Sequence, residues 1–177
     1  VDPAVYAAAR ADLAIVRDGG QITVTGSTGV DGTDSLTGVE RLQLYDVNLA
    51  FDVDGSAGQI YRLYQAAFDR APDLAGFGGW IYQMDHGLAL AQVASAFVAS
   101  AEFTSLYGAH PTDAQFVNLL YGNVLDRAPD TEGYDYWTYQ LAHGMSRDQA
   151  LVGFSESTEN QVAMIGAIES GMAYLPA

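Results

Sequence analysis

The sequence predicts a mainly α protein in which a small N-terminal β unit precedes an all-α bundle of two pseudo-repeated helical units. Apolar residues alternate with a period of two before about residue 55 and follow a helical period after it. Residues 64–103 align without a gap with residues 121–160, and 16 of the 40 pairs are identical. Repetition at this spacing indicates one supersecondary unit that is used twice.

The β unit is expected within residues 12–53 and to contain three or four strands. Residues 12–17 and 21–25 alternate around Asp18-Gly19-Gly20, which is typical of a hairpin. A loop rich in Gly, Ser and Thr follows at residues 26–32. Residues 39–47 are expected to form one further strand and residues 48–53 another, whereas residues 4–11 are either a short helix or the tail of a preceding segment.

Seven or eight helices are expected after residue 56. Pro72 lacks a backbone donor, so the first helix ends near Arg70, and Asp73 can cap the next one. His86-Gly87 is typical of a helix C-terminus. The expected boundaries are approximately 56–70, 73–86, 90–99 and 100–106 in the first copy, and 113–127, 130–143, 147–156 and 158–170 in the second.

Three segments follow from this division. Residues 1–55 form the β-rich segment, residues 56–170 form the duplicated helical domain with units at 56–108 and 113–165, and residues 171–177 form an apolar, extended tail. The duplication argues against a single asymmetric catalytic centre and favours a module that binds or holds something.

The charge balance limits the partners. The seven basic residues are all Arg, and 22 acidic residues bring the net charge to −15. Such a surface repels phosphate backbones and anionic membranes, so we expect neither nucleic-acid binding nor membrane insertion. No apolar run approaches the roughly 20 residues that span a bilayer. Cysteine is absent, which excludes thiol chemistry and disulfides.

The motif Asp-Arg-Ala-Pro-Asp-x-x-Gly occurs twice and is interpreted as a structural corner between helices. Arg70 can pair with Asp69 or Asp73 and reach carbonyls at the helix end. Gly76 removes a side chain and allows close approach. The alternative is that the corners present carboxylates to a ligand or cation. The structural candidates are Asp69, Arg70, Gly76, Asp126, Arg127 and Gly133.

Repeated aromatic residues are the candidates for ligand binding. Tyrosines combine an apolar ring with a polar tip and suit a half-hydrated face, whereas a helical Trp with apolar neighbours is more often part of the core. Both interpretations remain open. Together with the corner acids, the candidate ligand-binding residues are Asp73, Trp80, Tyr82, Asp130, Trp137 and Tyr139.

Residues 29–37 fit the calcium nonapeptide G-G-x-G-x-D-x-U-x except at Val30. In such repeats Gly permits the tight turn and Asp binds calcium between stacked rungs. A single rung cannot close a site, and the alternative is a Gly-Asp turn without an ion. The candidate calcium ligands are Asp31, Asp34, Asp52 and Asp54.

The pattern Tyr64…Asp69-Arg70-Ala71-Pro72-Asp73-x-x-Gly76-x-x-x-Trp80…His86-Gly87…Phe97-x-x-Ser100-x-Glu102-Phe103, with its second copy, resembles the DUF4214 family over about residues 56–165. The run from Gly32 to Leu44 is similar to the terminal segment of RTX-type calcium-binding proteins. The resemblance implies a bacterial protein exported by a type I system, with residues 168–177 holding part of the signal. Asn160 departs from the pattern, because the first copy has Phe103.

The sequence is compatible with three functions. The first is a non-enzymatic, extracellular attachment module of a secreted RTX-like protein at the bacterial cell surface, which recognises a polysaccharide or an envelope protein and is open to self-association. The second is a structural cap and type I secretion carrier without its own ligand. The third, a glycan hydrolase using Asp73, Asp130 or Glu132, is disfavoured because nothing in the sequence assembles an acid/base pair.

Overall fold

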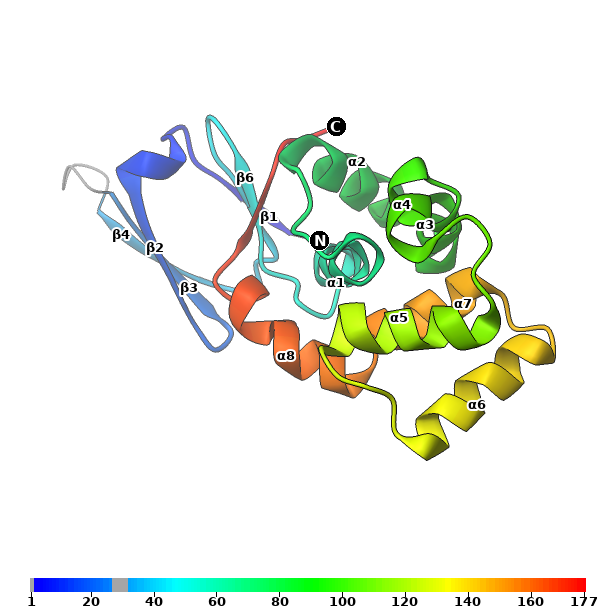
Figure 1. Cartoon of the computed structure of the whole chain (residues 1–177). Coiled ribbons are helices and arrows are strands. Elements are labelled where there is room, and N and C mark those ends of the chain that lie inside the picture. Colours follow the sequence, from blue (N-terminus) through cyan, green and yellow to red (C-terminus); the bar gives the residue numbers. More distant parts are fainter. Residues whose placement is uncertain (1, 27–31) are drawn as a thin grey trace. The chain divides into compact units, whose positions relative to one another are not determined.

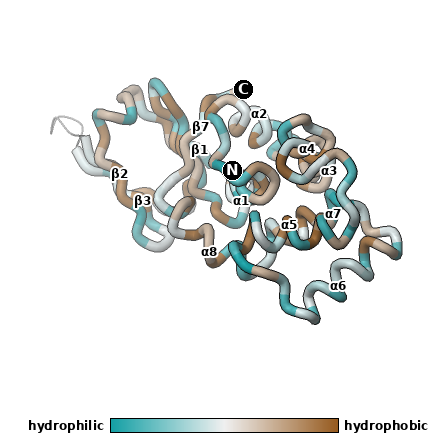
Figure 2. The backbone as a smooth tube through the Cα atoms, viewed as in Figure 1, coloured by the Kyte–Doolittle hydropathy of each residue, from teal (hydrophilic) through white to brown (hydrophobic). Residues whose placement is uncertain are grey.

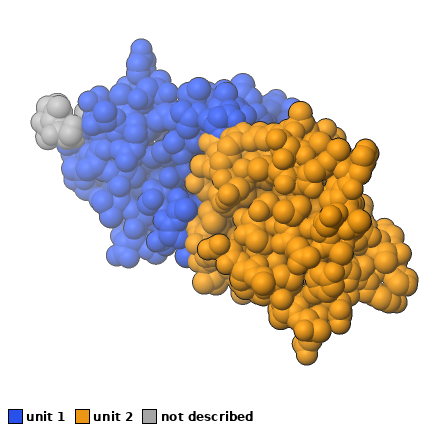
Figure 3. Space-filling view, in the orientation of Figure 1, with its two compact units in different colours: residues 1–58, 73–86, 165–177 blue, residues 59–72, 87–164 orange. Residues whose placement is uncertain are grey.

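The structure of the protein is a computed structural model that describes residues 2–26 and 32–177 (Figure 1). The fold is mixed α/β: eight α-helices in the described residues are accompanied by two small sheets. No described helix combines the length and the apolar character needed to cross a membrane. The chain forms two compact units, which Figure 3 distinguishes by colour.

Unit 1 consists of residues 1–58, 73–86 and 165–177 and contains both sheets. The first sheet has the strand order β1-β5-β6-β7, with β1 (Pro3–Val5) parallel to β5 (Arg41–Gln43). Strand β6 (Asn48–Ala50) pairs antiparallel with β5 and with β7 (Met172–Tyr174). The second sheet is an antiparallel meander, made of β2 (Leu13–Asp18), β3 (Gln21–Gly26) and β4 (Thr33–Thr37).

The hairpin predicted around Asp18-Gly19-Gly20 is confirmed. Asp18 pairs with Gln21 at the closed end, and Gly19 adopts a φ of 56°, which a residue with a side chain rarely does. Alternation along β3 buries Ile22 and Val24, which join residues of the first sheet in one apolar cluster. The other buried members of that cluster are Leu13, Leu42, Leu44, Leu49 and Phe51.

One expectation for the β unit is wrong. Residues 39–47 do not form one strand, because the chain turns after β5 and the backbone N–H of Leu44 donates to the carbonyl of Val47 at 3.2 Å. Of the two alternatives for residues 4–11, the short helix does not form, because β1 is followed by a single 3-10 turn at Arg10–Asp12. Residues 27–31 of the expected loop lie outside the described residues.

The expected extended tail forms strand β7 of the first sheet, so the part that follows residue 55 is not purely helical. Met172 and Tyr174 point inward and are buried. Helix α2 (Leu74–Asp85) packs on this strand: the Phe77 and Tyr174 ring centroids lie 6.4 Å apart, and Leu175 N donates to Leu74 O at 3.0 Å. Consequently α2 belongs to unit 1, together with both sheets.

Unit 2 consists of residues 59–72 and 87–164. It takes in most of α1 (Ser56–Phe68), the start of α8 (Thr158–Ile168) and five complete helices, among which α3 packs against α7 and α5 against α6. The predicted helix boundaries agree with the observed ones to within about two residues. The complete helices are α3 (Leu90–Val98), α4 (Ala101–Tyr107), α5 (Asp113–Leu125), α6 (Thr131–Ala142) and α7 (Arg147–Ser155).

Aromatic side chains fill the core of unit 2. The rings of Tyr64 and Phe97 meet edge to face with centroids 4.8 Å apart, and Tyr121 and Phe154 repeat this contact at 4.9 Å. Tyr107 stacks on Phe103, and its hydroxyl donates to the Ala66 carbonyl at 2.7 Å. Burial raises the pKa of Tyr107 to about 12. Figure 2 shows apolar residues along the helices of unit 2.

We expect removal of residues 171–177 to destabilise the fold. The truncation deletes β7 and with it the buried side chains of Met172 and Tyr174, each worth about 1.5–3 kcal/mol. Urea denaturation should therefore show a loss of about 3–6 kcal/mol or a separate, earlier transition for unit 1. Removing only residues 176–177 is the matched control, and equal stability of the two truncations would contradict this assignment.

Candidate functional site

The two Asp-Arg-Ala-Pro-Asp corners have the same local geometry. Asp69 and Asp126 end their helices in the left-handed region, with φ of 51° and 49°. Asp73 then accepts a hydrogen bond from Gly76 N at 2.8 Å, and Asp130 accepts one from Gly133 N at the same distance. The corner acids predicted as ligand-binding residues are therefore N-caps of α2 and α6.

Each corner arginine binds a glutamate, whereas the sequence predicted pairing with the neighbouring aspartates. Arg70 holds Glu102 through two hydrogen bonds of 2.6 and 3.0 Å, and Arg127 holds Glu159 through two of 2.7 and 2.9 Å. The Arg127 hydrogen bond lowers the pKa of Glu159, and the Gly133 N–H lowers the pKa of Asp130. The repetition of Glu at the same 32-residue distance from Arg was the available signal.

The glycine of the second corner, Gly133, lies close to a tyrosine ring. A Cβ atom added at Gly133 would lie 2.0 Å from the Tyr121 hydroxyl oxygen. The guanidinium carbon of Arg127 lies 4.9 Å from the centre of the same Tyr121 ring. The second corner therefore uses Asp130, Arg127 and Gly133 in contacts within unit 2.

The two repeated tryptophans are not open platforms. Trp137 is half-buried, its ring centroid lies 4.8 Å from that of Phe154, and Gly153 makes room for it. Trp80 is also half-buried. A tryptophan that packs in this way contributes to the core.

Helix α6 carries a row of exposed aromatic and polar side chains. Glu132, Tyr136, Tyr139 and His143 follow an i, i+4, i+7, i+11 spacing and lie on one helix face. Tyr136 is 52% exposed and Tyr139 is 59% exposed. We call these four residues the α6 row. The equivalent positions in α2 are Ala75, Gly79, Tyr82 and His86, so only the last two members are repeated.

The end of the row is a preorganised tyrosine–histidine pair. The Tyr139 and His143 rings stack with centroids 3.8 Å apart, and His143 Nδ1 lies 2.8 Å from the Tyr139 carbonyl oxygen. Because a carbonyl only accepts, Nδ1 is the donor in this contact, and Nε2 is not used by it. Tyr82 and His86 repeat the pair, with centroids 4.0 Å apart and an Nδ1 distance of 2.7 Å.

The described candidate calcium ligands do not converge. Asp34 accepts a hydrogen bond from the Tyr6 hydroxyl at 3.0 Å, and Asp54 is exposed. Asp31 lies outside the described residues. The part of the chain that the structure describes contains no group of three or more His, Cys, Asp or Glu residues that could hold a metal ion.

Asp52 instead belongs to a buried ion pair in unit 1. Its Oδ1 accepts from Arg41, whose side chain is 3% exposed, and its Oδ2 accepts from Ala57 N at 3.1 Å in the first turn of α1. Arg41 Nη2 also lies 3.6 Å from Asp85 Oδ2. Burial lowers the pKa of Arg41, and the proximity of Tyr174 and Asp85 opposes that shift.

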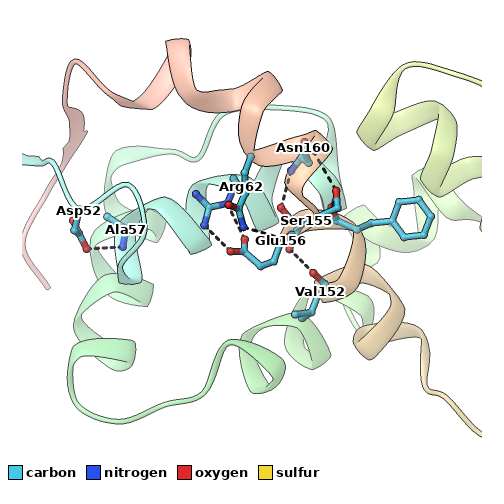
Figure 4. Close-up of polar contacts among 10 residues, drawn as sticks. Asp52, Ala57, Arg62, Val152, Ser155, Glu156 and Asn160 are labelled. Atoms are coloured by element: carbon cyan, nitrogen blue, oxygen red, sulfur yellow. Dashed lines mark hydrogen bonds and ion pairs between the residues drawn. The ribbon is translucent and has the colours of Figure 1, made fainter. Parts of the chain in front are cut away.

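A second buried polar cluster lies in unit 2 (Figure 4). Arg62 on α1 binds Glu156 through two hydrogen bonds of 2.9 and 2.6 Å. Asn160, which replaces the Phe of the first copy, is fully buried and donates to the Ser155 carbonyl at 2.8 Å. The sequence showed only that Asn160 departs from the pattern, and the structure shows that the change places a polar amide in the core.

Comparison with known proteins identifies one domain. Residues 94–164 match the family model described as DUF4214, a domain of unknown function. The chain contains a DUF4214 domain. The match runs from α3 to α8 and therefore includes the second corner and the α6 row. No curated protein and no solved structure matches the chain.

The buried pair gives a direct test of the role of Asp52. Asp52→Asn removes the carboxylate in closest contact with the buried Arg41 and leaves only Asp85, at 3.6 Å, so we expect a loss of about 3–5 kcal/mol in the free energy of unfolding, measured in EDTA. Asp54→Asn, a change at the neighbouring exposed position, should stay within about 0.5 kcal/mol of the unmodified chain. If the two variants were equally stable in EDTA, the ion pair would not support unit 1.

Proposed function

We propose that the protein is a non-enzymatic extracellular module that attaches a larger secreted protein to a bacterial cell-surface glycan, and that the α6 row is its binding face. The observation that carries this proposal is the pair of exposed tyrosines, Tyr136 and Tyr139, next to the carboxylate of Glu132. Tyrosine rings offer flat apolar area for the C–H face of a sugar, and their hydroxyls remain hydrated.

Preorganisation favours this face over the other exposed residues. His143 holds the Tyr139 ring from one side, so less rotamer entropy is lost when a ligand binds. The hydroxyl groups, the free His143 Nε2 and the acids at 132 and 135 provide donors and acceptors around the rings, which suits a neutral polyol. The net charge of −15 opposes an anionic ligand.

The proposal extends to the organisation of the chain. The equal corner contacts at Arg70 and Arg127 support two tandem DUF4214 units, at residues 56–108 and 113–165. In this arrangement the first repeat, residues 56–108, is structural, because its helix α2 packs on β7. The second repeat, residues 113–165, carries the binding face. The similarity of residues 32–44 to RTX-type proteins supports export by a type I system.

The alternative function is a structural cap and secretion carrier without a ligand. The observation that favours it is β7, because the last residues of the chain complete the sheet that contains β1. Fusing the chain behind a reporter in cells with a type I exporter tests this function. Absence of the reporter from the medium would overturn it.

Replacement of Tyr139 by Ala should weaken glycan binding by about tenfold, because an aromatic anchor at the centre of a face contributes more than about 1.4 kcal/mol. Titration against the surface polysaccharides selected on a glycan array gives the affinities. Tyr82→Ala changes the matched residue of α2, which has Ala75 and Gly79 in place of Glu132 and Tyr136, and should leave the affinity within twofold. Equal losses in both variants, or no binding by the unmodified chain, would contradict the α6 assignment.

Calcium binding is a separate proposal, motivated by the nonapeptide-like residues 29–37 and the high negative charge. An ion that binds only the folded chain raises stability by about 2.7 kcal/mol at a concentration 100 times its Kd. We therefore expect a higher melting temperature in millimolar calcium than in EDTA, with magnesium at the same concentration as the control for ionic strength. An unchanged melting temperature would remove calcium from the proposed function.

A further inference from the structure

A cavity of about 610 Å³ lies in unit 2, beside the linker that joins α4 to α5. Its wall is formed by the linker and one face of α5, where Gln115, Asn118 and Leu119 follow an i, i+3, i+4 spacing. The volume is in the range of small-molecule sites. The remaining lining residues are Tyr107, Gly108, Ala109, His110 and Pro111.

The linker is held in place by Arg147. This side chain donates to the Pro111 carbonyl, lies 3.6 Å from Asp113 and places its guanidinium carbon 5.2 Å from the centre of the Phe116 ring. Tyr107, at the other end of the linker, is buried and bonded to Ala66. The wall is therefore fixed at both ends before any ligand arrives, which reduces the cost of binding.

Two side-chain amides in this wall each use one polar atom in a hydrogen bond to the backbone, and the other polar atom of each can bind a ligand. Gln115 Oε1 accepts from Thr112 N at 2.9 Å, so its Nε2 is the remaining donor. Asn118 Nδ2 donates to the Ala114 carbonyl at 2.8 Å, so its Oδ1 is the remaining acceptor. The backbone partners determine both orientations, because a backbone N–H only donates and a carbonyl only accepts.

One donor and one acceptor on the same helix face, about 5–6 Å apart at Cβ, complement a secondary amide. The amide carbonyl would accept from Gln115 Nε2 and its N–H would donate to Asn118 Oδ1. Leu119 and Pro111 supply apolar surface for a small terminal methyl group. A peptide amide carries a continuing chain on both sides, whereas an acetamido group ends in that methyl group.

We propose that this cavity binds the acetamido group of an N-acetylated amino sugar. The choice of a sugar as the carrier of the amide rests on the glycan-binding function proposed above. The donor and acceptor that would bind the amide are observed independently of that function. The site lies on α5 and its linker and is distinct from the α6 row. The first copy of the repeat has Gly58, Tyr61 and Arg62 at the corresponding positions, so it lacks this donor–acceptor pair.

The test is an NMR titration of the full chain with N-acetylglucosamine, followed through the side-chain amide signals of Gln115 and Asn118. We expect saturable shifts with N-acetylglucosamine and none with glucose, which lacks the amide. Absence of shifts with N-acetylglucosamine overturns the site. If N-methylacetamide and an N-acetylated dipeptide bind with the same affinity as N-acetylglucosamine, the assignment to a sugar is overturned.

Gln115→Glu is the decisive variant, because the carboxylate still accepts from Thr112 N while the free donor becomes an acceptor. Affinity for N-acetylglucosamine should fall by about tenfold or more. Gln149→Glu makes the same change in the equivalent helix cap of α7, where Ser146 N donates to Gln149 at 2.9 Å, and should bind as the unmodified chain does. Unchanged affinity in Gln115→Glu overturns the proposal.

This experiment is independent of the α6 row. Tyr139→Ala, which should impair binding of surface polysaccharide, should leave the Gln115 and Asn118 shifts with N-acetylglucosamine unchanged. Loss of those shifts in Tyr139→Ala would overturn the separation of the two sites. Failure of polysaccharide binding with intact N-acetylglucosamine binding would reject the α6 proposal alone.

Discussion

The buried ion pair between Arg41 and Asp52 is the interaction on which unit 1 depends. Arg41 lies on β5 and is 3% exposed, and Asp52 joins it to the first turn of α1 through Ala57. Asp85, at the end of α2, and Tyr174, on β7, also lie close to the guanidinium. A charge removed from water requires such partners, so segments distant in sequence are held where they can provide them.

The duplicated motif has produced two helices with different roles. In α2 the residues after the corner are Phe77, Gly78 and Gly79, and the absence of a side chain at Gly78 lets the Leu175 carbonyl oxygen approach to 1.6 Å of where a Cβ would stand. In α6 the corresponding residues are Tyr134, Asp135 and Tyr136. An Asp at the Gly78 position would exclude that strand. The same corner therefore precedes one helix that packs on a sheet and another with an exposed aromatic face.

The carboxylates of the corners are already used structurally. Asp73 and Asp130 cap helices, and Glu102 and Glu159 bind the corner arginines. This use of the repeated acids gives a structural reason for the recurrence of the motif.

Local rules in the sequence determined most of the helix boundaries, the first hairpin and the duplication. Pro72, Asp73 and Gly87 act on the backbone within a few residues of themselves, so their effects can be predicted without knowing the fold. The pairing of residues 172–174 with β6, the Arg41–Asp52 and Arg62–Glu156 pairs and the burial of Asn160 were decided by the tertiary structure. These contacts join residues that are distant in sequence and meet only when the helices and strands pack together. The same packing decides that Trp137 is half-buried and that Tyr139 is exposed.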